Sequence, residues 1–272
     1  MGRTRSPFAS KPALEGLETA SREIRWAIMS MCQRAKTPLP GTALSCVDLL
    51  VALYCGALKT EPTLIDDPGR DQFIFDKPDA FCALYAILAR RGFLSTDELQ
   101  HFGESGSRLS RQPAPGRVPG IEWVPGSPGE ALSVAAGIAL AAHVRSSTAN
   151  VYVLMDERDL CIRAARTMSG LAPRLGLGNL TAVIEANRPA DTTQSTSADE
   201  WRLLGWNVRE IDGHDLPAIA KALQTRRTDS VPLAIVAYTT KGKGIPLIEA
   251  GACETRAPTL EELETARKDL AL

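Results

Sequence analysis

The second half of the chain alternates short apolar runs with helical patterns, and this alternation limits the possible folds more than any other feature of the sequence. The apolar runs have the length of strands and end at polar or turn-forming residues; they cover residues 151–155, 180–186, 207–211 and 233–238. The segments between them have helical spacing and cover residues 160–175, 198–204 and 216–223. Apolar strands that alternate with helices predict an α/β fold, with a doubly wound, mainly parallel sheet flanked by helices.

The first half adds helices, one further strand and a long irregular segment. Helical patterns are expected at residues 13–35, 44–58, 80–91 and 132–142, with a short buried strand at 72–75 and a last helix at 259–270. Residues 103–129 are rich in Gly, Pro, Ser and Arg and have little periodicity. An irregular segment of this length inside a compact domain is usually functional.

Polar residues follow the predicted strands, where a doubly wound sheet binds its ligands. In such a sheet the ligand lies beyond the carboxyl ends of the strands. The residues to examine are therefore those at 156–159, 185–187, 212–214 and 239–241.

Composition excludes several classes of function. The 31 Lys and Arg residues nearly balance the 32 Asp and Glu residues, giving a net charge of −1, so binding to nucleic acid through bulk charge is not expected. The longest apolar stretch, residues 131–144, is too short to span a membrane. Residues 1–12 have no apolar run typical of a signal peptide, so we interpret them as a flexible leader and expect a cytoplasmic protein.

The six cysteines are far apart in sequence and form no CxxC pair. This spacing favours buried free thiols in a reducing compartment over a zinc site or a disulfide framework.

Seven stretches, in order along nearly the whole chain, resemble the transketolase family. They are 41–50 (GTALSCVDLL), 70–71 (RD), 83–86 (ALYA), 119–122 (PGIE), 126–129 (GSPG), 212–215 (DGHD) and 240–246 (TKGKGIP). The resemblance covers the N-terminal half of that family and implies its thiamine diphosphate-binding fold. Residues 13–250 are expected to form this domain, and residues 251–272 a C-terminal helical tail.

Transketolases use thiamine diphosphate and Mg²⁺ to transfer two-carbon units, and the resemblance implies where this chain would hold them. Gly126, Ser127 and Gly129 match the family's glycine loop, which lets backbone N–H groups approach the diphosphate. Asp156, Glu157 and Arg158 match its Gly-Asp-Gly metal motif, with charged side chains at both glycine positions. Mg²⁺ would be held by Glu157, Asn187 and the carbonyl of Pro189. Each of these stretches also has a plain structural interpretation as a turn or a helix cap.

The resemblance also shows departures at the family's histidines. The matching positions hold Leu39, Asp79 and Gln112, and only His214 stands where a family histidine does, in a position expected to be structural. Leucine and glutamine cannot transfer protons as imidazole does, and a carboxylate at position 79 would repel a diphosphate.

Three functional hypotheses follow. The first is the diphosphate-binding subunit of a split, diverged transketolase-like enzyme, which needs a separate C-terminal-type subunit and forms a hetero-oligomer with it to make carbon–carbon bonds. The second is a catalytically silent structural or regulatory subunit of such a complex that has lost the cofactor. The third is a pocket that binds another anionic metabolite through Arg158 and Arg163 without a metal.

Overall fold

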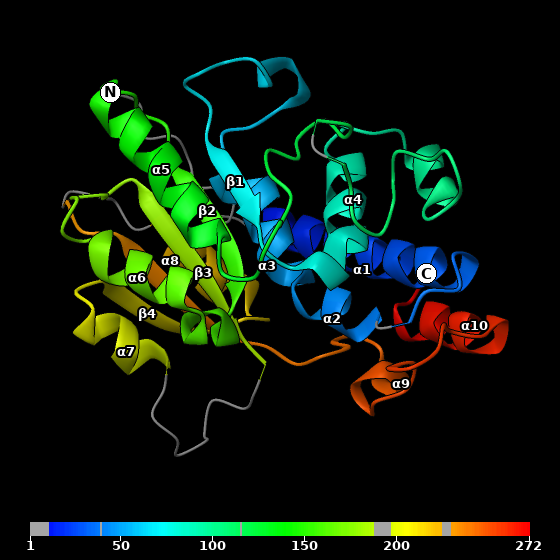
Figure 1. Ribbon diagram of the computed structural model, residues 1–272. Coiled ribbons are helices and arrows are strands. Elements are labelled where there is room, and N and C mark those ends of the chain that lie inside the picture. The colour runs from blue at the N-terminus through cyan, green and yellow to red at the C-terminus, as the bar shows by residue number, and fades with distance from the viewer. Residues whose placement is uncertain (1–10, 39, 115, 188–196, 225–229) are drawn as a thin grey trace.

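A five-stranded parallel sheet forms the centre of the computed structural model, which describes residues 11–38, 40–114, 116–187, 197–224 and 230–272 (Figure 1). The strands are β1 (Gln72–Phe75), β2 (Val151–Asp156), β3 (Leu180–Ala186), β4 (Asn207–Asp212) and β5 (Leu233–Tyr238). Their order is β1-β2-β3-β5-β4, and every neighbouring pair is parallel. The α/β fold and all five strands predicted from the sequence are confirmed.

Helices cover both faces of the sheet. The α-helices are α1 (Lys11–Arg34), α2 (Pro40–Ser45), α3 (Val47–Ala52), α4 (Phe81–Arg90), α5 (Ala131–Val144), α6 (Arg163–Leu171), α7 (Ser197–Leu203), α8 (Leu216–Leu223), α9 (Pro246–Glu249) and α10 (Leu260–Asp269). Shorter turns are the π-helix η1 (Leu53–Ala57) and the 3₁₀ helices η2 (Pro62–Leu64), η3 (Pro78–Ala80), η4 (Thr96–His101) and η5 (Glu157–Cys161).

Two hydrophobic cores form because alternate residues of each strand face opposite sides of the sheet. In β2, Val153 and Met155 belong to the core shared with α5, α6 and α7. Tyr152 and Leu154 belong to the core shared with α1, α3, α4 and α8. The central strands β2, β3 and β5 are almost completely buried, whereas β4 at the sheet edge is largely exposed.

Two predicted helices differ from the structure. The segment 44–58 divides into α2, α3 and the π-helix η1, because Cys46 leaves the helical conformation and Gly56, a weak helix former, lies in the last turn. The helix expected at 160–175 is replaced by η5 followed by the shorter α6. The backbone of Ile162 is extended (φ −89°, ψ 132°) and separates the two, and α6 ends ahead of Pro173.

The C-terminal segment packs onto the domain. A capping box joins Thr259 and Glu262 at the start of α10, and Ala266 and Leu270 enter the core beside α1. The predicted flexible leader, residues 1–12, falls outside the described residues except for Lys11 and Pro12, which begin α1. The predicted domain boundaries stay a prediction.

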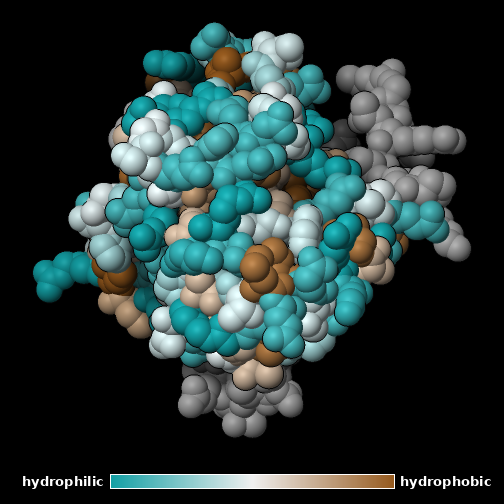
Figure 2. Space-filling view, turned by 90° about the vertical axis from the view of Figure 1, so that its right-hand side faces the viewer, coloured by the Kyte–Doolittle hydropathy of each residue, from teal (hydrophilic) through white to brown (hydrophobic). Residues whose placement is uncertain are grey.

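The surface is mostly polar on the side that Figure 2 presents, and apolar side chains appear there only in small separate spots. Four of the six cysteines are buried, as expected, but Cys161 is exposed and Cys55 half-buried. Cys161 ends the short helix η5, whose turn the helix prediction had missed. Among the described residues no helix combines the length and the apolar character needed to cross a bilayer.

A buried network around Asp48 ties α1, α3 and the loops after β4 and β5 together. The Arg25 guanidinium donates to both Asp48 oxygens, at 3.1 and 2.6 Å, and its Nε donates to the Lys243 carbonyl at 2.7 Å. His214 Nε2 accepts the Thr240 N–H at 2.8 Å, so the neutral ring carries its proton on Nδ1, which lies 2.9 Å from Asp48 Oδ2. Burial acts to raise the pKa of Asp48, but the His214 hydrogen bond and Arg25 outweigh it and lower that pKa to about 2. His214 is therefore structural, as predicted.

The Asp48 network predicts a large stability effect. Asp48→Asn removes the charge that balances the buried Arg25, so the free energy of unfolding should fall by about 3 kcal/mol in urea denaturation. The control is Asp66→Asn at an exposed aspartate, which should change it by less than about 0.5 kcal/mol. An Asp48→Asn loss no larger than that of the control would contradict this account.

Candidate functional site

The carboxyl ends of β1, β2 and β3 lie together at one end of the sheet, beside a cavity of about 340 Å³. Strand pairing sets Asp156, the last residue of β2, beside Glu185 of β3. The cavity is lined by Thr42, Asp76, Lys77, Pro78, Asp79, Gln112, Pro125, Gly126, Ser127, Pro128, Asp156, Arg158 and Asp159. The prediction that polar residues after the strands come together is confirmed for β2, and the irregular segment 103–129 supplies the opposite wall.

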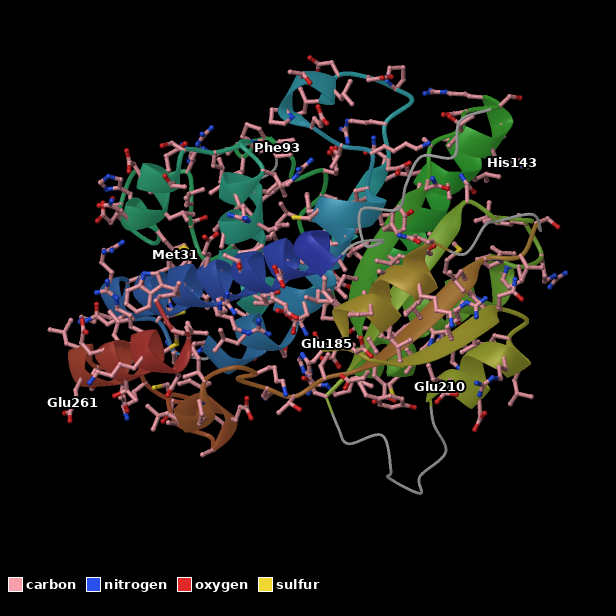
Figure 3. The ribbon with its side chains drawn as sticks, turned by 180° about the vertical axis from the view of Figure 1, so that it is seen from behind. Met31, Phe93, His143, Glu185, Glu210 and Glu261 are labelled. Carbon is pink, nitrogen blue, oxygen red and sulfur yellow. The ribbon has the colours of Figure 1, made fainter. Side chains whose placement is uncertain are left out.

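Lys77 lies among the carboxylates at this end of the sheet. Its ammonium group forms an ion pair with Glu185, and both side chains are almost completely buried. Asp156 Oδ2 lies 4.0 Å from the same nitrogen. Burial acts to lower the pKa of Lys77, but the Glu185 carboxylate more than offsets it, so that pKa is raised and the lysine stays charged. Figure 3 shows Glu185 in the interior, where the sheet meets the helices of the first half of the chain.

Sequence reasoning missed Lys77 and Asp76, although a signal was available. Both residues directly follow the apolar strand β1, just as Asp156 ends β2. Because the two strands are parallel, all three residues lie at the carboxyl ends of the strands.

The side chains of the Asp156–Asp159 turn form hydrogen bonds within the turn itself. The Asp156 carboxylate caps η5 and is held by Arg158, with Nε at 2.9 Å from Oδ1 and Nη2 at 3.4 Å from Oδ2. Asp159 accepts the Asp156 N–H at 2.9 Å. Burial opposes ionisation of Asp156, but the hydrogen bonds from Arg158 and the nearby Lys77 lower its pKa. The two charged residues that stand at the glycine positions of the family motif thus neutralise each other.

In the glycine loop, one position requires glycine and one backbone donor is already paired. Gly129 has a positive φ of +76°, and a Cβ there would lie 2.8 Å from Ile162, so only glycine fits. The Ser127 N–H, however, donates to the Glu130 carboxylate at 3.2 Å, and Pro128 has no N–H to offer. Gly126 lies beside the same carboxylate. A negative group therefore lies where the family's loop would receive a diphosphate.

The structure describes two of the three residues expected to hold Mg²⁺, Glu157 and Asn187. Asn187 Oδ1 lies 3.0 Å from the Thr239 hydroxyl, which also lies 2.9 Å from a Glu185 oxygen. Glu157 and Asn187 are not among the cavity-lining residues, and Pro189 falls outside the described residues. Within the described ranges, no three His, Cys, Asp or Glu side chains are placed to share a metal ion.

The groups that a metal-bound diphosphate would need at this site are already paired within the chain. The Asp156 carboxylate is already paired with Arg158, and the loop donor Ser127 N–H is paired with Glu130. A diphosphate would also face the carboxylates of Asp76, Asp79 and Asp159 across the same cavity. The described residues do not fit a metal-bound diphosphate, and the cofactor and metal roles of the predicted residues stay predictions.

Two of the three residues that match the family's histidines line the same cavity. Asp79 and Gln112 both line the cavity, and Leu39 falls outside the described residues. Of the two arginines suggested for anion binding, Arg158 lines the cavity, whereas Arg163 is exposed at the start of α6 and is not among the lining residues.

Comparison with known proteins identifies the family. Residues 18–271 match the family model described as transketolase, thiamine diphosphate binding domain. The chain belongs to the transketolase family. It is 32% identical over 267 residues to one subunit of the apulose-4-phosphate transketolase of Phocaeicola vulgatus, and the match covers 95% of both chains.

Longer transketolases match over only part of their length. The chain is 29% identical to a transketolase of Sinorhizobium medicae over 89% of its own length but 37% of that protein. The crystal structure of transketolase from Campylobacter jejuni superimposes with a TM-score of 0.86 at 25% identity, covering 95% of this chain and 43% of that one. The transketolase fold predicted from the sequence is confirmed, and the chain corresponds to the N-terminal domain of the longer proteins.

Asp76 gives this site a measurable pH dependence. Burial, followed by the charges of Asp159 and Glu130, raises the pKa of Asp76 to about 7. An acid whose pKa is raised by folding binds more protons in the folded state, so its contribution favours folding at low pH and is lost as pH rises from about 4 to 7. Asp76→Asn should therefore stabilise the protein at pH 8, by on the order of 2 kcal/mol or more, and have little effect near pH 4, at the pKa of the unfolded chain. Urea denaturation of both proteins at the two pH values measures this, and equal effects at both would contradict it.

The Asp156–Arg158 pair predicts a gain of function. The triple variant Asp156→Gly, Glu157→Asp, Arg158→Gly restores the family's motif and removes the internal pair. Addition of Mg²⁺ with thiamine diphosphate should raise the melting temperature of this variant by several degrees, because ligand bound to the folded state stabilises it. The unaltered protein and the control Arg163→Ala should not respond. Stabilisation of the unaltered protein would overturn the conclusion that its residues do not fit the metal-bound diphosphate.

Proposed function

We propose that this chain is the N-terminal-type subunit of a two-chain transketolase-like transferase. The observation that carries the proposal is the end-to-end match to a protein named as one subunit of a transketolase, against a match to little more than a third of single-chain transketolases. A second relative, 6-deoxy-6-sulfo-D-fructose transketolase subunit SqwG of Clostridium, matches over 82% of this chain and 84% of its own length. The partner would be a separate chain of the C-terminal transketolase type.

Two roles within such a complex are open to the chain. The first is cofactor binding, in which the subunit contributes the diphosphate site of a thiamine diphosphate-dependent enzyme that transfers two-carbon or acyl units. The family model and the left-handed conformation of Gly129 in the Gly126–Gly129 loop support this role. Thiamine diphosphate, when bound, supplies the carbanion chemistry of such transfers, and the protein supplies binding and orientation.

The second role is that of a silent subunit that completes the complex without holding the cofactor. It is favoured by the Asp156–Arg158 pair, which closes the turn where a metal would bind, and by the Glu130 carboxylate bound to the glycine loop. Within the described residues the second role is better supported, because Asp156 is paired with Arg158 and the Ser127 N–H with Glu130. The shared fold and a partner-binding surface would then be what the chain retains.

One experiment tests the subunit proposal and separates the two roles. The chain is purified from its natural host in buffer with Mg²⁺ and thiamine diphosphate, and the intact complex is weighed by native mass spectrometry. A heteromer with a C-terminal-type transketolase chain is expected, and a chain that purifies alone or only with itself would contradict the proposal. A heteromer without cofactor mass supports the silent role, whereas one cofactor for each pair of chains supports cofactor binding.

A further inference from the structure

A second cavity, of about 310 Å³, lies between the end of α1, the start of α4 and residues 102–112. It adjoins the first cavity, because Pro78, Asp79 and Gln112 line both. No residue of the five described strands lines it, and neither do the described residues that were predicted to hold thiamine diphosphate or Mg²⁺. The second cavity is therefore separate from the site at the carboxyl ends of the strands.

The buried part of this second lining is apolar. It consists of Cys32 from α1, Phe81 and Cys82 from α4, and Phe102, each no more than 5% exposed. The buried ring of Tyr85 packs against both phenylalanines, with ring centroids 6.1 Å from Phe81 and 6.0 Å from Phe102. Thiol and aromatic groups carry no charge at neutral pH, so this wall suits the apolar body of a ligand.

Arg111 is the cationic side chain of the same lining. It is exposed, and it forms no ion pair with another residue of the described ranges. Its two neighbours in the chain are held in place. The Tyr85 hydroxyl donates to the Ser110 carbonyl at 2.7 Å, and the Ser110 hydroxyl donates to the Gln112 carbonyl. A segment anchored to α4 therefore places a guanidinium group at the cavity, and that group has its donors available for an anion.

Asp79 limits the charge of that anion. It is the acidic side chain of the lining, and within the described part of the chain it has no ion-pair partner. Arg111 can balance one negative charge on a ligand, whereas a second negative charge would meet the Asp79 carboxylate. A carboxylate carries one charge and matches the planar fork of a guanidinium group with two parallel hydrogen bonds.

We propose that the second cavity binds a small organic acid with one carboxylate and an apolar body. The carboxylate lies against Arg111, and the apolar body lies against Phe81 and Phe102. A volume of about 310 Å³ is in the range of small-molecule sites. The inference concerns a cavity of this chain alone, so it depends neither on a partner subunit nor on whether thiamine diphosphate binds.

Isothermal titration of the full chain tests the proposal with four probes. They are 3-phenylpropanoate, its neutral amide, acetate and inorganic phosphate. The phenylpropanoate is expected to bind at one saturable site. The amide lacks the charge, acetate lacks the apolar body and phosphate carries excess charge, so each should bind about tenfold or more weakly. Arg111→Gln should weaken the phenylpropanoate by about tenfold or more, because it removes the charge that faces the carboxylate. Asp79→Asn should instead tighten it by about twofold to fivefold, because it removes a like charge.

A matched control separates this cavity from general surface charge. Arg117→Gln removes the same charge from an exposed residue that lines neither cavity, and it should leave phenylpropanoate binding unchanged. Arg111 and Asp79 are exposed, so their variants should fold normally, and thermal unfolding of each variant checks this. Absence of phenylpropanoate binding, or tighter binding of phosphate, would overturn the proposal. Equal effects of Arg111→Gln and Arg117→Gln, or binding of the amide as tight as that of the acid, would overturn it as well.

Discussion

The ion pair between Lys77 and Glu185 joins the strands that build the site. Lys77 follows β1 at one edge of the sheet and Glu185 lies in β3, so the pair spans the end of β2 between them. Both side chains are removed from water, where a lone charge would be very costly, and each makes the other tolerable. The pair fixes the place where β1, β2 and β3 end, and with it the position of Asp76 and Asp156. Asp76, Lys77 and Asp156 all line the cavity.

The protein combines the framework of its family with a site whose side chains are paired within the chain. The parallel sheet, the helix order and the Asp48 network have kept a fold that superimposes on a transketolase with a TM-score of 0.86. At the carboxyl ends of the strands, charged side chains pair among themselves. Asp156 with Arg158, and Glu130 with the Ser127 N–H, satisfy within the chain the bonds that a ligand would otherwise make. Such internal pairing stabilises the loops and occupies the side chains that a metal would need.

The lining of the cavity is acidic, because it carries more carboxyl groups than cations. In a partly enclosed space the field of such groups is screened less than at an open surface. The loop on one side of the cavity is also fixed in shape, because Gly129 has a positive φ and lies against Ile162, so this position requires glycine.

The sequence by itself determined the sheet and the location of the site at its edge. Apolar runs of strand length that alternate with helices allow few folds, and the ends of parallel strands must meet at one edge. The seven matching stretches identified the family, and Asp79 and Gln112, which the sequence singled out, both line the cavity. Local patterns failed where a helix was interrupted, as at Ile162, because a single extended residue leaves the apolar spacing almost unchanged.

Only the tertiary structure decided which charges neutralise each other. Lys77 and Glu185 are far apart in the chain, and the pairing of Arg158 with Asp156 rather than with a ligand depends on a turn that sequence spacing does not fix. The unpartnered Asp76 oxygen likewise became visible only when its surroundings were known, because burial and hydrogen bonding belong to the folded state.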